Sequence, residues 1–210
     1  MKVLNLYAGI GGNRKLWQDV DVTAVEIDPQ IARVYQDYFP DDKMVIGDAH
    51  QYLLDHFREF DFIWSSPPCP SHSRANYWAN FGKNRNITYP DMSLYQEVIL
   101  LRNYAKRGVW VVENVIPYYD PLIPSVEVDR HLFWANFRIS QKDSLPKTKP
   151  FNMMTNSDWQ EYYGFDLGEY KIPGKLKILR NCVHPETGLH ILECARGIIN
   201  SKSEQASLFT

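Results

Sequence analysis

Two positions in the sequence combine a reactive side chain with a rigid setting. Cys69 follows two prolines at the end of the apolar run 61–66, and Glu113 ends a second apolar run, 108–112. Proline fixes φ and lacks an N–H donor, so the chain must leave the first run in one defined direction. A thiol held in this way suits nucleophilic attack, and a nearby carboxyl suits proton transfer. The alternatives are a small buried hydrophobe for Cys69 and a structural acid for Glu113.

Both apolar runs are typical of central strands in a parallel sheet, because a strand covered on both faces is apolar throughout. In open parallel sheets the carboxyl ends of the strands face the ligand crevice. The sequence therefore predicts an α/β fold in which Cys69 and Glu113 lie at neighbouring strand ends, at the mouth of one site.

A glycine-containing turn follows the first predicted strand, residues 3–8. Gly9-Ile-Gly-Gly-Asn is expected to lead into an amphipathic helix that carries Leu16 and Trp17. Glycines between a first strand and a first helix let the backbone approach a ligand closely and aim helix N–H groups at it. This turn is therefore a candidate binding loop.

Acidic residues end the next two predicted strands, 22–28 and 44–48. Glu26 stands about twenty residues after the glycines, where an adenosine ribose would present its hydroxyls, and Asp48 ends the third strand. Both acids could instead be N-caps of the helices that follow, the first of which is expected to open at Pro29. Acids after successive strands favour the nucleoside site.

Further elements are predicted in the remainder of the chain. A long polar and aromatic loop at 71–90 is expected to close on a substrate, because loops of this length in compact domains are usually lids or binding loops. The other expected elements are a helix over 91–107, a strand over 132–139, an irregular appendage at 140–177, and a final helix from His184 to about Asn200 before a polar tail.

Length and composition limit the fold class. The chain has 210 residues, of which 44% are hydrophobic, which suits one sizeable α/β core with a small appendage. No stretch approaches the roughly eighteen uncharged apolar residues of a membrane span, and the sequence opens into a strand rather than a signal peptide. The three cysteines have no framework spacing. We therefore expect a soluble, cytoplasmic protein without disulfide bonds.

The net charge of −2 conceals an uneven distribution of charge. Residues 70–112 carry six Lys and Arg against two Asp and Glu, whereas residues 1–69 carry six against eleven. A polyanion approaching Cys69 would meet the basic stretch that follows it. An ordinary solvated surface would account equally well for so small an excess.

The motifs occur in a specific order: Leu6-Tyr-Ala-Gly-Ile-Gly-Gly, Glu26, Asp48, Pro67-Pro-Cys69 and Glu113-Asn-Val. In this order and spacing they resemble the cytosine-5 DNA methyltransferase family, in particular a small bacterial or phage-like member. Asn181-Cys-Val resembles the family's final motif. The resemblance covers most of the chain and implies a Rossmann-like, S-adenosylmethionine-dependent methyltransferase fold with a reduced target-recognition appendage.

The resemblance implies a division into parts and a set of binding residues. The parts are a catalytic and cofactor-binding core at 1–139, a recognition appendage at 140–177, a segment returning to the core at 178–200 and a flexible tail at 201–210. The implied S-adenosylmethionine site comprises Tyr7, Ala8, Gly9, Ile10, Gly11, Glu26, Ile27, Asp48, Ala49, Pro67, Asn181 and Val183. No metal is implied.

The family's chemistry implies three catalytic residues, Cys69, Glu113 and Arg130. The thiolate of Cys69 would attack C6 of a cytosine flipped out of DNA, which enables C5 to accept the methyl group. Protonated Glu113 would donate to N3 as negative charge develops there. Arg130 stands near the position of the family's arginine pair, which lowers the pKa of the thiol; Arg74 and His131 are further candidates for this role.

The chain departs from the family around the cysteine. Ser65 and Ser66 stand where the family has Gly-Gly before Pro-Pro-Cys, and Pro70 stands where it has Gln. The geometry of this loop must therefore differ. The small appendage suggests a short or relaxed recognition sequence in DNA.

Other interpretations stay open. Family members with these motifs also act on transfer RNA, and an inactive homologue could bind nucleic acid without turnover. Cys182, His184, His190 and Cys194 superficially resemble a zinc site, although His190 and Cys194 also fit helix packing.

The tail contains the string Gln205-Ala-Ser-Leu-Phe209. It resembles the pentapeptide by which bacterial DNA-acting proteins dock on the replication sliding clamp. In that resemblance Leu208 and Phe209 fill an apolar pocket and Gln205 supplies orienting hydrogen bonds; the alternative is that both apolar residues pack back on the domain. The expected partners of this monomer are thus double-stranded DNA and a bacterial clamp.

Overall fold

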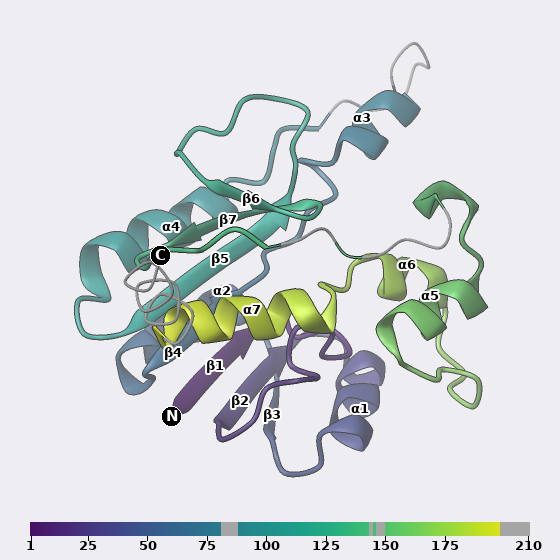
Figure 1. Cartoon of the computed structure of the whole chain (residues 1–210), viewed down its shortest axis with the longest axis horizontal. Coiled ribbons are helices and arrows are strands. Elements are labelled where there is room, and N and C mark those ends of the chain that lie inside the picture. Colours follow the sequence, from purple (N-terminus) through teal and green to yellow (C-terminus); the bar gives the residue numbers. More distant parts are fainter. Residues whose placement is uncertain (81–87, 143–144, 146–149, 198–210) are drawn as a thin grey trace, which may run out of the picture.

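A seven-stranded sheet lies at the centre of the part of the chain that the computed structural model describes, residues 1–80, 88–142, 145 and 150–197. Its strands are β1 Lys2–Leu6, β2 Asp21–Glu26, β3 Lys43–Ile46, β4 Phe62–Ser65, β5 Val109–Val115, β6 Val126–Val128 and β7 His131–Ala135. Their order is β3-β2-β1-β4-β5-β7-β6 (Figure 1). The first five pair in parallel, and β7 runs antiparallel to β5 and β6. The predicted Rossmann-like α/β fold is confirmed.

The parallel strands end level with one another. Leu6 pairs with Val25 on one side and with Ser65 on the other, and Ser65 pairs with Val112. The next residue along each strand therefore lies at the same edge of the sheet, the edge that faces ligands in open parallel sheets. These four residues are Tyr7, Glu26, Ser66 and Glu113.

Side chains of the sheet alternate between two hydrophobic clusters, one on each face. In β4, Ile63 belongs to one cluster, whereas Phe62 and Trp64 belong to the other. All three are fully buried, and each such side chain contributes roughly 1.5–3 kcal/mol to folding relative to an exposed one. Because both faces are covered, the strands are continuous apolar runs, which made them recognisable in the sequence.

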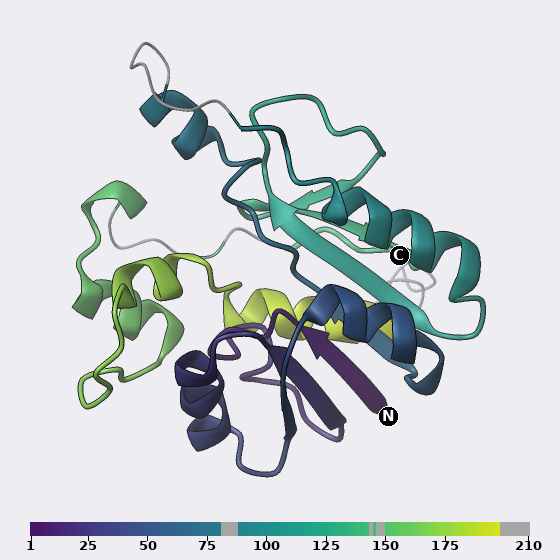
Figure 2. The ribbon, with the colours of Figure 1, turned by 180° about the vertical axis from the view of Figure 1, so that it is seen from behind.

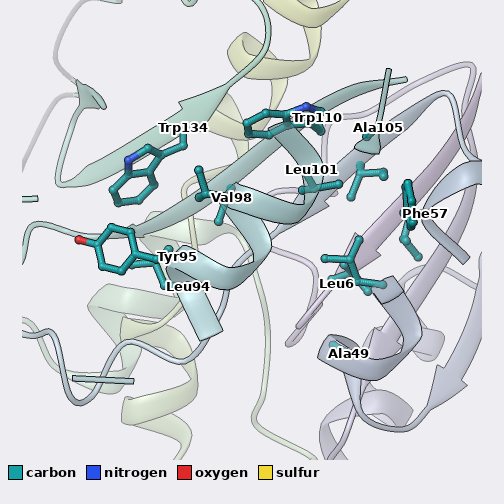
Figure 3. Close-up of a cluster of buried hydrophobic side chains, with 14 of the residues drawn as sticks. Leu6, Ala49, Phe57, Leu94, Tyr95, Val98, Leu101, Ala105, Trp110 and Trp134 are labelled. Atoms are coloured by element: carbon teal, nitrogen blue, oxygen red, sulfur yellow. The ribbon is translucent and has the colours of Figure 1, made fainter. Parts of the chain in front are cut away.

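Helices cover both faces of the sheet. α2 (Ala49–His56) and α4 (Ser93–Tyr104) pack on one face, where Leu94 and Leu101 of α4 share a cluster with Trp110 of β5 (Figures 2 and 3). α1 (Pro29–Tyr38) and α7 (Pro185–Ala195) contribute to the cluster on the other face. The shorter helical elements are η1 Phe57–Glu59, α3 Arg74–Asn80, η2 Phe151–Met153, α5 Asn156–Tyr163 and α6 Lys175–Arg180.

The prediction of a helix after the glycine turn is wrong. Residues 7–20 form successive turns, and the C-terminal helix α7 covers this part of the sheet instead (Figure 1). Asn13 holds the turns in place, because its side-chain amide donates to Oδ1 of buried Asn5 at 2.8 Å. Gly188 of α7 lies so close that a Cβ atom there would be 2.1 Å from the carbonyl oxygen of Asn13. A tertiary contact thus replaces the local helix.

The loop and the appendage are more helical than predicted. α3 lies within the expected loop 71–90, of which residues 81–87 fall outside the described part of the chain. The appendage, predicted as irregular over 140–177, contains α5 and the first half of α6, and both helices lie beyond the carboxyl ends of the strands (Figure 1). Trp159 and Leu179 from these helices share a hydrophobic cluster with Val34 of α1. The helical appendage is therefore packed on the core.

The C-terminal helix is confirmed, although it ends at Ala195 rather than near residue 200. Residues 198–200 and the tail at 201–210, with its clamp-like string, lie outside the described residues. None of the described helices has the length and apolar character needed to span a membrane.

Candidate active site

A cavity of about 510 Å³ opens at the carboxyl edge of the sheet. The turn after β1, the end of β2, the Pro-Pro-Cys loop after β4, the end of β5 and the segment 172–183 all contribute to its walls. The predicted site residues that line it are Tyr7, Ala8, Gly9, Ile10, Glu26, Ile27, Pro67, Cys69, Glu113, Asn181 and Val183. Most of the residues singled out in the sequence therefore meet at one place.

Glu26 is fixed by its own backbone surroundings. Its carboxylate accepts hydrogen bonds from the amide of Gly9 at 2.9 Å and from the amide of Asp28 at 3.0 Å. An ionised carboxylate offers about four acceptor positions, so capacity for a ligand hydroxyl remains at the cavity wall. Asp28, rather than Glu26, caps α1.

Three of the predicted cofactor residues do not line the cavity. Asp48 caps α2 by accepting from the amides of His50 and Gln51, at 2.9 and 3.3 Å, which is the capping alternative considered for it. Ala49 is buried in the hydrophobic cluster beneath α2. Gly11 faces α1, because a Cβ atom there would be 2.3 Å from the ring of Phe39. A cofactor role for these residues stays a prediction.

The glycine turn and the C-terminal part of the chain are in direct contact. A Cβ atom on Gly12 would be 2.5 Å from the carbonyl oxygen of Val183, so only glycine allows this approach. The contact brings Asn181 and Val183 to the cavity beside Gly9. The two ends of the described chain thus build one pocket.

Cys69 is half-buried, and its loop is held by two backbone hydrogen bonds. The amides of His72 and Ser73 donate to the Cys69 carbonyl at 3.0 and 3.1 Å. Burial, together with the negative charge of Glu113, raises the pKa of the Cys69 thiol to about 11. The thiol of the resting protein is therefore protonated at neutral pH.

Glu113 is buried beside Cys69, and burial raises the pKa of its carboxyl to about 7. Ser66 donates a hydrogen bond to Glu113 and partly opposes this shift in pKa. The indole Nε1 of Trp64 donates to Oγ of Ser66 at 2.8 Å, which leaves the serine proton for the carboxylate. Ser66, at a position where the family has glycine, thus supplies a hydrogen bond to the candidate acid, Glu113. Asn114 joins the loop to β5 by donating to the Pro67 carbonyl at 2.9 Å.

Arg130 does not line the cavity. Its Nη2 atom donates to the carbonyl oxygens of Arg180 and Cys182, at 2.7 and 3.1 Å, and to the hydroxyl of Tyr163 at 2.8 Å. The guanidinium lies over the rings of Phe151 and Trp159. Arg130 therefore ties the appendage to the core, while its charge still opposes the rise in the pKa of Cys69. A catalytic role for Arg130 stays a prediction.

The other cations considered for Cys69 are differently placed. Burial, followed by the charge of Arg130, lowers the pKa of His131 well below its usual value, so this ring is neutral although its Nε2 lies 3.6 Å from Oε1 of Glu113. Arg74 donates to the Pro117 carbonyl at 2.8 Å. Lys177 was missed: it lines the cavity from α6 and opposes the rise in the pKa of Cys69. Its place one helical turn before Asn181 was the available signal.

The four residues of the zinc alternative have other contacts. Nδ1 of His184 accepts from the amide of Glu186 at the start of α7, and the Cys182 thiol lies 3.5 Å from the Ile178 carbonyl. Nε2 of His190 lies 3.0 Å from the Ser140 carbonyl and 3.7 Å from the sulfur of Cys194. Among the described residues, no group of three or more His, Cys, Asp or Glu side chains could hold a metal ion.

Comparisons with known proteins show which family and fold the chain shares. Two curated relatives from Herpetosiphon aurantiacus are similar to the chain: Type II methyltransferase M.HgiCII, 28% identical over 123 residues, and Type II methyltransferase M.HgiBI, 32% identical over 127 residues. Each alignment covers 57% of this chain and 27% of the relative, so the chain matches about a quarter of the relatives' length.

The solved structure of the methyltransferase EhMeth from Entamoeba histolytica has a similar fold, with a TM-score of 0.57 and 12% identity over 93% of this chain and 97% of that one. Residues 1–117, which carry the glycine turn, Glu26, Cys69 and Glu113, match the family model described as C-5 cytosine-specific DNA methylase. With more than half of its length matched, the chain belongs to the C-5 cytosine-specific DNA methylase family.

Proposed function

We propose that the chain transfers a methyl group from S-adenosylmethionine to C5 of cytosine in DNA, through a covalent bond between Cys69 and a base rotated out of the duplex. S-adenosylmethionine is the methyl donor that family membership implies. The observation that carries the proposal is that Glu26, Cys69 and Glu113 line one cavity at the carboxyl edge of the sheet.

The residues around the cavity fit this cofactor. A volume of about 510 Å³ falls within the range of roughly 300–1,000 Å³ that is usual for small-molecule sites. Glu26 offers acceptors to ribose hydroxyls, and the neighbouring side chain of Ile27, 69% exposed, offers apolar surface to a purine ring. When bound, S-adenosylmethionine supplies the methyl group as an electrophilic carbon attached to a sulfonium.

The protein's own residues make cytosine C5 reactive. A bond forms between Sγ of Cys69 and C6 of the base, while Glu113 donates its proton to N3 and C5 becomes nucleophilic. After C5 is methylated, a base removes the C5 proton and the bond between Cys69 and C6 breaks. The thiolate and the aromatic ring are restored, and N3 returns its proton.

The proton on Glu113 serves a second purpose. Ionised Glu113 is one of the causes that raise the pKa of Cys69, so protonation of this carboxyl favours the thiolate. Lys177 and Arg130 act in the same direction. Protonated Glu113 thus assists the reaction at cytosine N3, whereas ionised Glu113 disfavours the thiolate of Cys69.

Methylation assays test the proposal directly. The protein is incubated with S-adenosylmethionine labelled in its methyl group, with duplex DNA in one reaction and transfer RNA in another. We expect labelled 5-methylcytosine in DNA. Label only in transfer RNA would establish the alternative substrate, and an absence of label from both would indicate an inactive nucleic-acid-binding homologue.

We further propose that residues 140–177 form the small target-recognition part of the protein. α5 in this segment carries a capping box between Thr155 and Asp158 and ends at Gly164, so it is a well-defined helix. Mapping modified cytosines in genomic DNA from expressing cells would reveal the length of the recognised sequence. We expect a short or relaxed one, since the appendage is small.

Glu26→Ala is expected to raise the dissociation constant for S-adenosylmethionine about 10- to 100-fold, because a hydrogen bond to a charged group is worth about 1.5–3 kcal/mol. Isothermal titration calorimetry would measure the change. Asp21→Ala is the matched control: it removes an exposed acid, which does not line the cavity, from the opposite end of the same strand, β2. It should leave the affinity unchanged. Equal affinity losses in both variants would refute the ribose role.

We propose that Gln205-Ala-Ser-Leu-Phe209 docks on a bacterial sliding clamp. A short peptide must be ordered on binding, so we expect a micromolar affinity, about −8 kcal/mol. Truncation after Glu204 should abolish clamp binding in calorimetry without changing activity on short oligonucleotides. Absence of binding by the full chain, or unfolding of the truncated chain, would contradict docking.

A further inference from the structure

A buried carboxylate outside the cavity joins two parts of the candidate site. Glu97 lies on α4, on the helix face that also carries Leu94, Val98 and Leu101, and it is fully buried. These apolar neighbours pack into the cluster drawn in Figure 3. A carboxylate in such surroundings is costly unless hydrogen bonds satisfy it.

Donors from three separate elements converge on Glu97. The hydroxyl of Tyr7 donates to Oε1 at 2.6 Å, and Nδ1 of His50 lies 2.9 Å from the same oxygen. The hydroxyl of Ser65 donates to Oε2. Hydrogen bonding to Glu97 raises the pKa of His50, which favours the protonated ring that balances the buried negative charge. Both oxygens of the carboxylate therefore have hydrogen-bond partners.

Two of these donors belong to the loops that build the site. Tyr7 opens the glycine turn, lines the cavity and has a φ of 55°, in the left-handed region that a tyrosine rarely adopts. Ser65 is the last residue of β4 and leads directly into the Pro-Pro-Cys loop. The bond from Ser65 to α4 needs a hydroxyl, which the glycine expected at this position would lack.

We propose that Glu97 is a positioning residue that locks the glycine turn to the Pro-Pro-Cys loop. The lock holds Tyr7 in its left-handed conformation and fixes the start of the segment that carries Cys69. It thereby sets the distance between the bound methyl donor and the nucleophile, an assignment that rests on the proposed function. Glu97 itself does not line the cavity, so it acts through Tyr7 and Ser65.

Two measurements test the lock. Hydrogen exchange on the cofactor-free protein reports the opening of the two loops through the amides of residues 7–11 and those of His72 and Ser73, which donate to the Cys69 carbonyl. Calorimetry with S-adenosylhomocysteine reports the affinity of the cofactor site. We expect Glu97→Gln and Ser65→Ala to accelerate exchange in both loops together, by about tenfold, since each removes a link between them. Glu97→Gln should also weaken S-adenosylhomocysteine binding about tenfold.

Asn136→Ala is the control. It removes two hydrogen bonds at the end of β5 opposite the cavity: the Trp110 amide donates to Oδ1 of Asn136, and Nδ2 donates to the Gly108 carbonyl, each at 2.9 Å. We expect unchanged exchange in the two loops and unchanged binding. The double variant Tyr7→Phe with Glu97→Gln should exchange no faster and bind no more weakly than Glu97→Gln alone, because both substitutions break the same link between the two loops.

Several results would overturn the proposal: unchanged exchange in Ser65→Ala, acceleration in only one loop, or additive effects of Tyr7→Phe and Glu97→Gln. If Glu97→Gln does not fold, hydrogen exchange in Ser65→Ala still tests the link between the two loops. If the unaltered protein fails to bind S-adenosylhomocysteine, the proposed function fails, whereas hydrogen exchange still decides whether Glu97 couples the loops.

Discussion

Cys69→Ser is expected to lower the rate of methyl transfer by more than about a thousandfold while leaving the affinity for S-adenosylmethionine unchanged. A serine hydroxyl is nearly the same size as a thiol but is far less nucleophilic and far less ionised. Because Cys69 is only half-buried, the substitution should not disturb the fold. Single-turnover rates on a duplex oligonucleotide would measure the loss, and calorimetry would measure affinity.

A fluorinated substrate makes the same prediction visible. If the target cytosine carries fluorine at C5, the methylated C5 has no hydrogen that a base could remove. The bond from Cys69 to C6 then persists, and the complex of protein and DNA survives denaturing electrophoresis. Cys194→Ser is the matched control, since Cys194 is buried in α7 and does not line the cavity. It should retain turnover and trapping. Turnover by Cys69→Ser, or trapping that depends on Cys194, would exclude Cys69 as the nucleophile.

Glu113→Gln is expected to lower kcat/KM by about a hundredfold or more, because an amide cannot supply the proton that N3 requires. The pH dependence should change as well. The reactive form has a protonated Glu113 and an ionised Cys69, and it has lost one proton relative to the fully protonated pair. Between the pKa of Glu113, about 7, and that of Cys69, about 11, the prevailing form has also lost one proton.

The rate of the unaltered protein should therefore rise with pH up to about 7 and remain level above it. In Glu113→Gln the acid no longer titrates, so the lower rate should keep rising with pH through this range as the thiolate forms. A pH profile of kcat/KM between pH 6 and 9.5 would distinguish the two shapes. A level profile in Glu113→Gln would show that another group sets the break near pH 7.

The strands and the central pair of site residues could be predicted because their signals are local. An apolar run such as 61–66 indicates a strand buried on both faces, and Cys69 and Glu113 follow two such runs. Parallel pairing then brings strand ends together without further information. Glu26 was found in the same way, since the residue type at a strand end carries the signal.

The features that escaped prediction depend on residues distant in sequence. The turns at 7–20 replace a helix because α7, some 170 residues later, packs on them. Asp48 has the same sequence signal as Glu26, yet it caps a helix. Glu97 lies on a helix whose pattern gives no sign of a site, and Lys177 could have been found only through its place one helical turn before Asn181. In each case packing between distant elements, rather than local preference, decided the outcome.

The late position of α7 in the chain has a consequence for synthesis on the ribosome. While residues 1–135 are being made, the face of the sheet that carries Trp64 has no helix from the C-terminal part to cover it, because residues 185–195 do not yet exist. Contacts between the two ends of a chain are slow to form, and exposed apolar surface favours aggregation during that interval. The nascent chain should therefore need protection by a chaperone until α7 leaves the exit tunnel, and the cofactor pocket should form only after that.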